Sequence, residues 1–178
     1  MAAGSLPAPD PSLGGVCGTR NGTGLRLGIV AARWNLEVTA RLVRGAQQAM
    51  TDLGVEPSDT GLPADAGGSV LAWAPGSFEL PVVAKAMAGS GRFDAVVAIG
   101  AVVRGETTHY DLVSEGAADG LMRAGLDTGV PVIFGVIATE NDEQALARST
   151  DGPSNRGYEA VLTAVETVTL LRALAAIG

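Results

Sequence analysis

The sequence predicts an α/β fold, a three-layer α/β/α sandwich of flavodoxin-like type with a four-stranded parallel sheet. Two observations support this prediction. Four short runs are apolar throughout, as in strands that are buried on both faces of a sheet. Segments with apolar residues at helical spacing separate these runs, and such alternation produces a parallel sheet with right-handed crossovers.

The four strands are expected at RLGIVA (26–31), SVLAWA (69–74), DAVVAIGAVV (94–103) and VPVIFGVIA (130–138). A helix follows each of the first three strands. After the fourth, a short helix over NDEQALAR (141–148) precedes a long C-terminal helix. The apolar positions at helical spacing are Val38, Leu42, Ala46, Ala49 and Leu53, then Val113, Ala117, Leu121 and Ala124, and finally Ala160, Ala164, Val165 and Val168.

Local signals mark the ends of these elements. The polar stretch EPSDTGLPADAGG (56–68) ends the first helix, and a turn at residues 151–154 precedes the last helix. Ser77 is expected to cap the second helix, which begins near Phe78 and accommodates Pro81 in its first turn.

The chain divides into two parts by composition. Residues 1–24 are mainly Pro, Gly, Ser and Ala, so we expect a flexible N-terminal arm, with Cys17 as an incidental exposed thiol. Residues 25–178 are expected to form a single domain, because their number suits one buried core and no internal repeat is visible. A single cysteine excludes an intramolecular disulfide.

Composition also excludes several classes of function. The net charge of −7 repels phosphate backbones, so no nucleic-acid partner is expected, although one local arginine can still hold a small anion. One histidine and one cysteine argue against a protein-built zinc site. No apolar run approaches the ~20 residues of a membrane helix, and no secretory signal is visible, so we expect a cytoplasmic protein without a membrane partner.

Ligands of an open parallel sheet bind beyond the carboxyl ends of its strands, where three unusual segments lie. Trp34, in ARWN, follows the first strand and either stacks on a flat heterocycle or covers the sheet edge. Gly76, Ser77, Phe78 and Glu79 follow the second strand. They either cap a helix, which the residues alone favour, or bind a polyol through amides and a carboxylate.

The third segment is GAVVRGETTHYD, from Gly100 to Asp111. Thr108 and Asp111 fit a capping box at the start of a helix, so the amides of residues 105–107 are expected at a helix N-terminus, a natural cradle for an anion. His109 is the only histidine of the chain, and at this strand end it is either a structural residue or a proton carrier. An imidazole, whose pKa in peptides is about 6.5, suits proton transfer at neutral pH.

Known catalytic fingerprints of other enzyme classes are absent from the sequence. It contains neither the glycine-rich turn of dinucleotide-binding folds nor the P-loop motif for phosphates. It also lacks the G-x-S-x-G elbow of serine hydrolases.

With these residues in view, the chain resembles the 6,7-dimethyl-8-ribityllumazine synthase family over roughly residues 25–175. The resemblance rests on ARWN, APGSFELP, GAVVRGETTHYD, PVIFGVIATEN and the NRG of residues 155–157, in the family's order and spacing. It implies a condensation without a cofactor in riboflavin biosynthesis. The two substrates are 5-amino-6-(D-ribitylamino)uracil and 3,4-dihydroxy-2-butanone 4-phosphate, and the products are the lumazine, phosphate and water.

The resemblance also assigns roles to residues of this chain. Trp34 is expected to stack on the pyrimidine, and His109 to transfer protons. The ribityl chain is expected at Gly76, Ser77, Phe78 and Glu79, the ring beside Val102 and Val103, and the phosphate at Gly105, Glu106 and Thr107, with the Glu106 carboxylate turned away. The neighbouring subunit is expected to supply Phe134 as a wall of the ring site and Arg148 as a partner of the phosphate.

One residue departs from the family pattern. The family usually has lysine where this chain has Arg156, and arginine is bulkier, stays protonated and prefers planar partners. Glu159 is placed to hold Arg156. This departure keeps open an alternative function, a catalytically impaired homologue that binds lumazine or flavin and forms a shell. A second alternative, an archaeal-type riboflavin synthase, is disfavoured by the intact GETTHYD and APGSFELP segments.

Assembly is also implied by the resemblance. Family members form pentamers whose active sites lie between adjacent subunits, and some build sixty-subunit icosahedral shells. The turn STDGPSN (149–155) lacks an insertion, which favours the shell. The expected partners are therefore two small substrates, one of them phosphorylated, and further copies of the chain.

Overall fold

A parallel sheet of four strands forms the middle layer of the computed structural model, which describes residue 7, residues 10–56 and residues 68–177. The strand order is β2-β1-β3-β4, and all neighbouring strands run parallel. The strands are β1 (Leu27–Ala32), β2 (Val70–Ala74), β3 (Ala95–Val103) and β4 (Val132–Thr139). Each begins and ends within two residues of its predicted bounds, so the predicted parallel sheet is confirmed.

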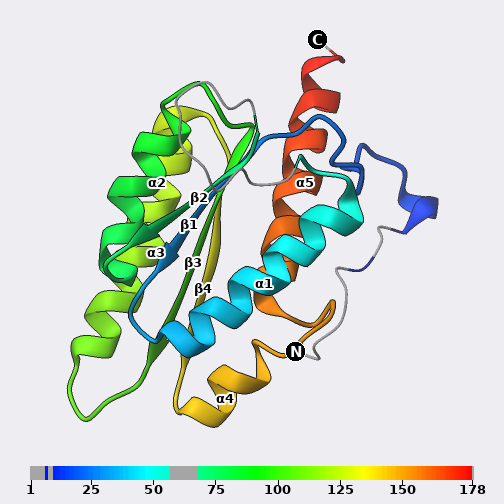
Figure 1. Cartoon of the computed structure of the whole chain (residues 1–178). Helices are drawn as coiled ribbons and strands as arrows, with labels where there is room; N and C mark the ends of the chain where they lie inside the picture. Colours follow the sequence, from blue (N-terminus) through cyan, green and yellow to red (C-terminus); the bar gives the residue numbers. More distant parts are fainter. Residues whose placement is uncertain (1–6, 8–9, 57–67, 178) are drawn as a thin grey trace.

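Helices cover both faces of the sheet, as the fold prediction requires (Figure 1). α2 (Leu80–Ala88) and α3 (His109–Thr128) lie on one face. α1 (Leu36–Leu53) and α5 (Arg156–Ala175) lie on the other, and the short α4 (Asp142–Ala147) follows β4. Two short 3₁₀ helices, η1 (Pro11–Leu13) and η2 (Ser77–Glu79), complete the described elements.

Two apolar cores separate the sheet from its helices, because successive side chains of a strand point to opposite faces. Ile29 packs in the core beneath α1 and α5, whereas Val30 packs in the core beneath α2 and α3. Both side chains are fully buried, and burial of each stabilises the fold by about 1.5–3 kcal/mol relative to exposure.

α1 and α5 approach each other closely at two glycines. A Cβ atom at Gly157 would collide with the carbonyl oxygen of Leu42, and one at Gly45 would collide with the side chain of Asn155. Asn155 is fully buried; its Oδ1 accepts a hydrogen bond from the Gly157 N–H at 2.8 Å, and its Nδ2 donates to the Arg41 carbonyl at 3.2 Å. The N-terminus of α5 is therefore fixed to α1.

The expected arm is bound to the rest of the chain near its end. The backbone N–H of Thr19 donates to Thr169 Oγ1 at 2.8 Å, and Arg20 forms an ion pair with Glu166 at 2.9 Å. Polar groups of residues 19–22 thus find partners on α5 and at the end of α1, and the expected flexibility of the arm stays a prediction. Cys17 is exposed, as expected. The division of the chain into an arm and a domain at residue 25 stays a prediction.

Most of the stretch predicted to end the first helix, residues 57–67, and most of the first part of the arm lie outside the described residues. Among the residues that the structure describes, no helix has both the length and the apolar composition needed to cross a bilayer.

Candidate active site

The strand order reverses between β1 and β3, and the helices that follow these strands lie on opposite faces of the sheet (Figure 1). A crevice lies beyond the ends of these strands, as expected at such a reversal. It contains a cavity of about 660 Å³, which we call the crevice pocket. Its lining residues come from the ends of three strands and from the first turns of α3. They are Trp34, Asn35, Gly76, Ser77, Phe78, Glu79, Ala101, Val102, Val103, His109, Leu112 and Val113.

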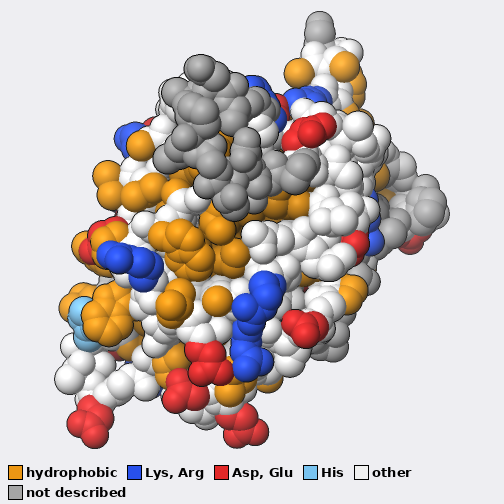
Figure 2. Space-filling model, viewed as in Figure 1, with side chains coloured by type: hydrophobic (Ala, Val, Ile, Leu, Met, Phe, Trp, Pro, Cys, Tyr) orange, Lys and Arg blue, Asp and Glu red, His pale blue; other side chains and the backbone are white. Residues whose placement is uncertain are grey.

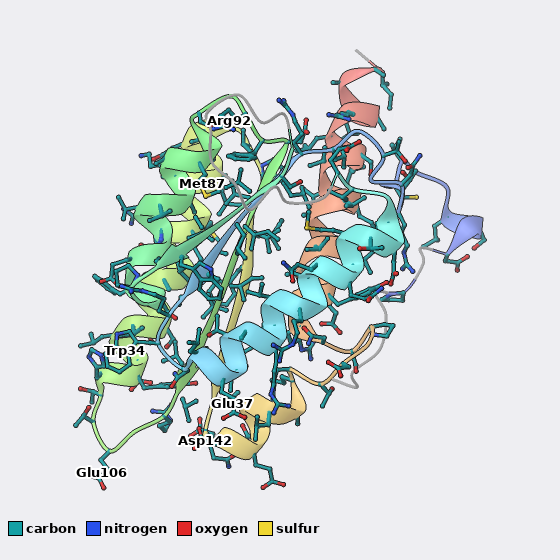
Figure 3. The ribbon with its side chains drawn as sticks, in the orientation of Figure 1. Trp34, Glu37, Met87, Arg92, Glu106 and Asp142 are labelled. Atoms are coloured by element: carbon teal, nitrogen blue, oxygen red, sulfur yellow. The ribbon has the colours of Figure 1, made fainter. Side chains whose placement is uncertain are left out.

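Trp34 lies in the loop between β1 and α1, and its position is fixed by its neighbours (Figure 3). The backbone N–H of Trp34 donates to the Pro75 carbonyl at 3.3 Å, and Asn35 Nδ2 donates to the Ala101 carbonyl at 2.8 Å. Asn35 adopts the left-handed conformation, with φ of 56°, which its short polar side chain tolerates. The Trp34 side chain is 74% exposed, so it covers little of the sheet edge and remains open to a flat ligand.

The segment after β2 corrects one predicted helix cap. Ser77 does not cap the second helix; Gly76 precedes the turn η2, Ser77 is its first residue, and α2 begins only at Leu80. The hydroxyl of Ser77 is buried and has no hydrogen-bond partner among the described residues. It faces Gly100, where a Cβ atom would lie 2.6 Å from the hydroxyl oxygen. Pro81 lies in the first turn of α2, as predicted.

The predicted capping box at the start of α3 is also wrong. Thr108 precedes the helix, but its side chain makes no capping hydrogen bond, and Asp111 instead pairs with Arg104 at 3.2 Å. The amides of residues 105–107 donate no hydrogen bond to any residue that the structure describes. This loop is exposed, and Figure 3 shows Glu106 at its outer tip, pointing away from the sheet.

His109 begins α3 and lines the crevice pocket. It is exposed, and its backbone N–H donates to Thr107 Oγ1 at 3.4 Å. Figure 2 shows the histidine beside a group of hydrophobic side chains at this end of the molecule. The crevice therefore places one imidazole between an apolar pocket and a loop of free amides.

Arg104 follows β3 and directly precedes the same loop. Its Nε donates to Glu140 at 2.7 Å, and its guanidinium lies 4.0 Å from the centre of the Tyr110 ring. Partial burial tends to lower the pKa of Arg104, but the hydrogen bond to Glu140 and the charge of Asp111 outweigh it and raise the pKa above its usual value. The guanidinium therefore stays charged beside both carboxylates.

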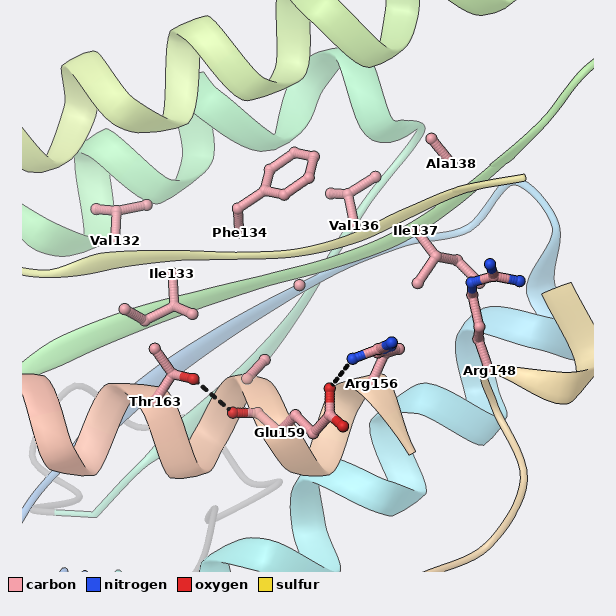
Figure 4. Close-up of a pocket in the computed structure, with 12 residues that line it drawn as sticks. Val132, Ile133, Phe134, Val136, Ile137, Ala138, Arg148, Arg156, Glu159 and Thr163 are labelled. Carbon is pink, nitrogen blue, oxygen red and sulfur yellow. Dashed lines mark hydrogen bonds and ion pairs between the residues drawn. The ribbon is translucent and has the colours of Figure 1, made fainter. Parts of the chain in front are cut away.

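A second cavity, of about 490 Å³, lies along the edge strand β4 and the start of α5, and we call it the β4 pocket (Figure 4). Phe134, Arg148 and Arg156 line it, together with Glu159. The predicted ion pair between Arg156 and Glu159 is confirmed. Arg148 is held at the end of α4, where its Nη1 donates to the Gln144 carbonyl at 3.0 Å.

The two pockets share no lining residue. In the sheet register, Phe134 pairs with Ala98, and Val102 lies four residues further along β3. At ~3.3 Å per residue, Phe134 lies about 13 Å from Val102 along the sheet. One copy of the chain therefore does not bring Phe134 to the crevice pocket.

A comparison with known protein families identifies the family of the chain. The model of a family described as 6,7-dimethyl-8-ribityllumazine synthase matches residues 24–172 of the 178-residue chain. The chain belongs to this family. The predicted resemblance is confirmed, and so is the flavodoxin-like α/β/α fold. Lumazine synthases are transferases of riboflavin biosynthesis, so membership assigns the chain to this pathway.

Sequence reasoning about this lumazine synthase family member missed several residues of the crevice pocket. Leu112 and Val113 lie one turn after His109 on the same helix, so helical periodicity could have found them. Asn35 carries no such signal, because its left-handed backbone and its bond to Ala101 depend on the packing of the loop. Within the described part of the chain, no three His, Cys, Asp or Glu side chains gather as potential metal ligands.

Proposed function

We propose that this protein condenses 5-amino-6-(D-ribitylamino)uracil with 3,4-dihydroxy-2-butanone 4-phosphate, giving 6,7-dimethyl-8-ribityllumazine, phosphate and water without a cofactor. One observation carries the proposal beyond family membership. An apolar pocket with an exposed tryptophan adjoins a loop of free amides, and the only histidine lies where they meet. The cytoplasm is the proposed location.

The crevice pocket supplies the binding site for the pyrimidine. The exposed indole of Trp34 stacks on the heterocycle, while Val102 and Val103 border the ring. The ribityl chain lies along Gly76–Glu79, where backbone amides and the exposed carboxylate of Glu79 bind a polyol.

The loop of Gly105, Glu106 and Thr107 binds the phosphate through its amides and the threonine hydroxyl. A Cβ atom at Gly105 would meet nothing within 4 Å, and the backbone there is not left-handed, so neither packing nor conformation within the chain requires glycine. A close approach by a ligand explains it. Glu106 points away at the loop tip, which keeps its charge from the anion.

His109 transfers protons during imine formation, phosphate elimination and ring closure. Its position between the pocket and the loop lets it reach groups on both substrates. Much of the acceleration comes from holding the two reactants together, which suits a site with a single imidazole.

A neighbouring copy completes the site with Phe134, Arg148 and Arg156. The separation of the β4 pocket from the crevice pocket within one chain supports this arrangement, since Phe134 lies about 13 Å from Val102 along the sheet. We propose a pentamer, in which each subunit gives its crevice pocket to one neighbour and its β4 pocket to the other. Twelve such pentamers form the sixty-subunit shell of some family members.

The two-substrate assay tests the proposal. The full-length protein is mixed with both substrates, and the fluorescent lumazine is followed against the uncatalysed background. His109→Ala is expected to lower kcat by about a hundredfold. Cys17→Ser, at an exposed position outside both pockets, is the matched control. Absence of product above background would rule out the proposed activity.

Arg156 supports one alternative, a homologue that binds lumazine or riboflavin and has lost turnover. Its ion pair with Glu159 shows that an arginine is accommodated in the β4 pocket. Under this alternative, riboflavin quenches the tryptophan fluorescence of the protein although no lumazine forms, and Arg156→Lys restores catalysis. Normal turnover by the unchanged protein dismisses it.

A further inference from the structure

Arg104 directly precedes the loop of residues 105–107, and its backbone and side chain contact the segments around this loop. Its backbone N–H donates to the Thr139 carbonyl at the end of β4, at 2.8 Å, and its Nε donates to Glu140 at 2.7 Å. Its Nη1 donates to Asp111 in the first turn of α3, at 3.2 Å. The same guanidinium lies over the ring of Tyr110. Arg104, the residue that precedes the loop, is therefore bonded to the end of β4 and to the first turn of α3.

The loop itself contributes little to its own position. Residues 105–108 are exposed, and Gly105 has nothing within 4 Å of where a Cβ would lie. The hydrogen bond from the His109 N–H to Thr107 Oγ1, at 3.4 Å, is long for its kind. The conformation of this loop thus depends on how its two ends are held.

Charge gives Arg104 a second effect on the same loop. Asp111 lies in the first turn of α3, and Glu140 directly follows β4. Both carboxylate side chains are about half exposed. Figure 2 shows acidic side chains gathered around this end of the molecule. Without a cation between them, these carboxylates would repel a phosphate dianion at the loop.

We propose that Arg104 is a positioning residue for the phosphorylated substrate. Its guanidinium holds both ends of the loop of residues 105–107 and pairs with Asp111 and Glu140, so that neither carboxylate opposes the phosphate. Arg104 does not contact the substrate; it acts through the loop. This inference rests on the proposed function, because it concerns the same site.

Arg104→Gln tests the inference through a split between the two substrates. KM for 3,4-dihydroxy-2-butanone 4-phosphate is expected to rise about tenfold, because a charge-assisted network is lost and two carboxylates become unpaired. KM for the ribitylaminouracil should stay within about twofold, because the crevice pocket is unchanged. Arg104→Lys should recover part of the loss, since a lysine pairs with one carboxylate but cannot bridge both.

Arg123→Gln is the matched control. Arg123 lies on α3, is 73% exposed at its side chain and pairs with Asp119 at 3.2 Å, so the same charge is removed away from the loop. Neither KM should change in this variant. The ion pairs of Arg104 are solvent-exposed and contribute little to folding, so Arg104→Gln should unfold at nearly the same temperature as the unchanged protein.

A binding measurement separates failure of this inference from failure of the proposed function. Inorganic phosphate is titrated into each protein by calorimetry, which needs no turnover, and Arg104→Gln should bind it about tenfold more weakly. If the unchanged protein makes no lumazine, the proposed function fails, and calorimetry alone decides the role of Arg104. Equal phosphate affinity in both proteins, absence of phosphate binding, or a parallel rise in both KM values would overturn the inference.

Discussion

The crevice pocket is lined mainly by apolar side chains and backbone, whereas the β4 pocket brings two arginines and a carboxylate beside an aromatic ring. The first offers a surface for a flat, neutral ring, and the second offers charge. A substrate pair that consists of a heterocycle and a phosphate ester needs both. The difference supports the proposal that each chain carries two complementary halves of a site, which meet between copies.

The two pockets also differ in how they are supported. Trp34 and the loop of residues 105–107 are exposed and held at their ends by hydrogen bonds. Arg156 instead follows the fully buried Asn155, which is bonded to α1. Substitutions near the crevice pocket should therefore affect activity, whereas those beneath the β4 pocket should also affect stability.

The strongest test of this comparison is complementation between the two halves. His109→Ala and Arg148→Ala should each lower activity by about a hundredfold, because one removes the proton carrier and the other a charged phosphate partner. In mixed oligomers assembled at random from both variants, about a quarter of the sites would combine two intact halves. Activity measured after co-refolding should rise to a comparable share of the unchanged protein.

Each variant refolded alone is the control for this experiment. If both pockets act within one chain, mixing would give only the average of the two weak activities. That outcome would contradict the shared site.

Asn155→Ala tests the different support of the β4 pocket. Loss of the helix cap and of the buried bond to Arg41 should lower the free energy of unfolding by about 2–3 kcal/mol. Asn141→Ala is the matched control, because Asn141 also caps a helix but is exposed, and about 1 kcal/mol is expected there. Urea denaturation measures both. Equal losses would show that the buried contact with α1 contributes nothing.

Gly105→Ala sharpens the description of the phosphate loop. The added methyl group meets no atom of the chain, so the melting temperature should not change. It would, however, crowd a bound phosphate, and KM for the phosphorylated substrate should rise several-fold, on the order of tenfold at most. The unchanged KM for the pyrimidine substrate serves as an internal control. A glycine needed only for folding would give the opposite pattern.

Arg156→Lys should give the smallest effect. Lysine keeps the charge and can still pair with Glu159, so KM for the pyrimidine substrate should change by about threefold or less. Steady-state kinetics at fixed phosphate ester measure the change. A large gain in kcat would instead favour the catalytically impaired alternative.

Much of the fold could be predicted because its strands are apolar at nearly every position. β3 is buried along almost its whole length, so its sequence indicates a central strand without any knowledge of its neighbours. Helix caps were harder to predict. Asp111 pairs with Arg104 instead of forming the predicted capping box, and Ser77 faces Gly100 instead of capping a helix. Both arrangements depend on how the loops pack, which local residue spacing does not show.

The sequence by itself determined the α/β order, the family and the gathering of Trp34, Val102 and His109 at one sheet edge, since the carboxyl ends of parallel strands meet there. Only the tertiary structure decided that Phe134 lies beside Ala98, about 13 Å from Val102, in a separate pocket. The physical reason is that the register between two strands is set by their mutual hydrogen bonds and packing. β3 and β4 are apolar at nearly every position, so the hydrophobic pattern of the sequence does not distinguish one register from another.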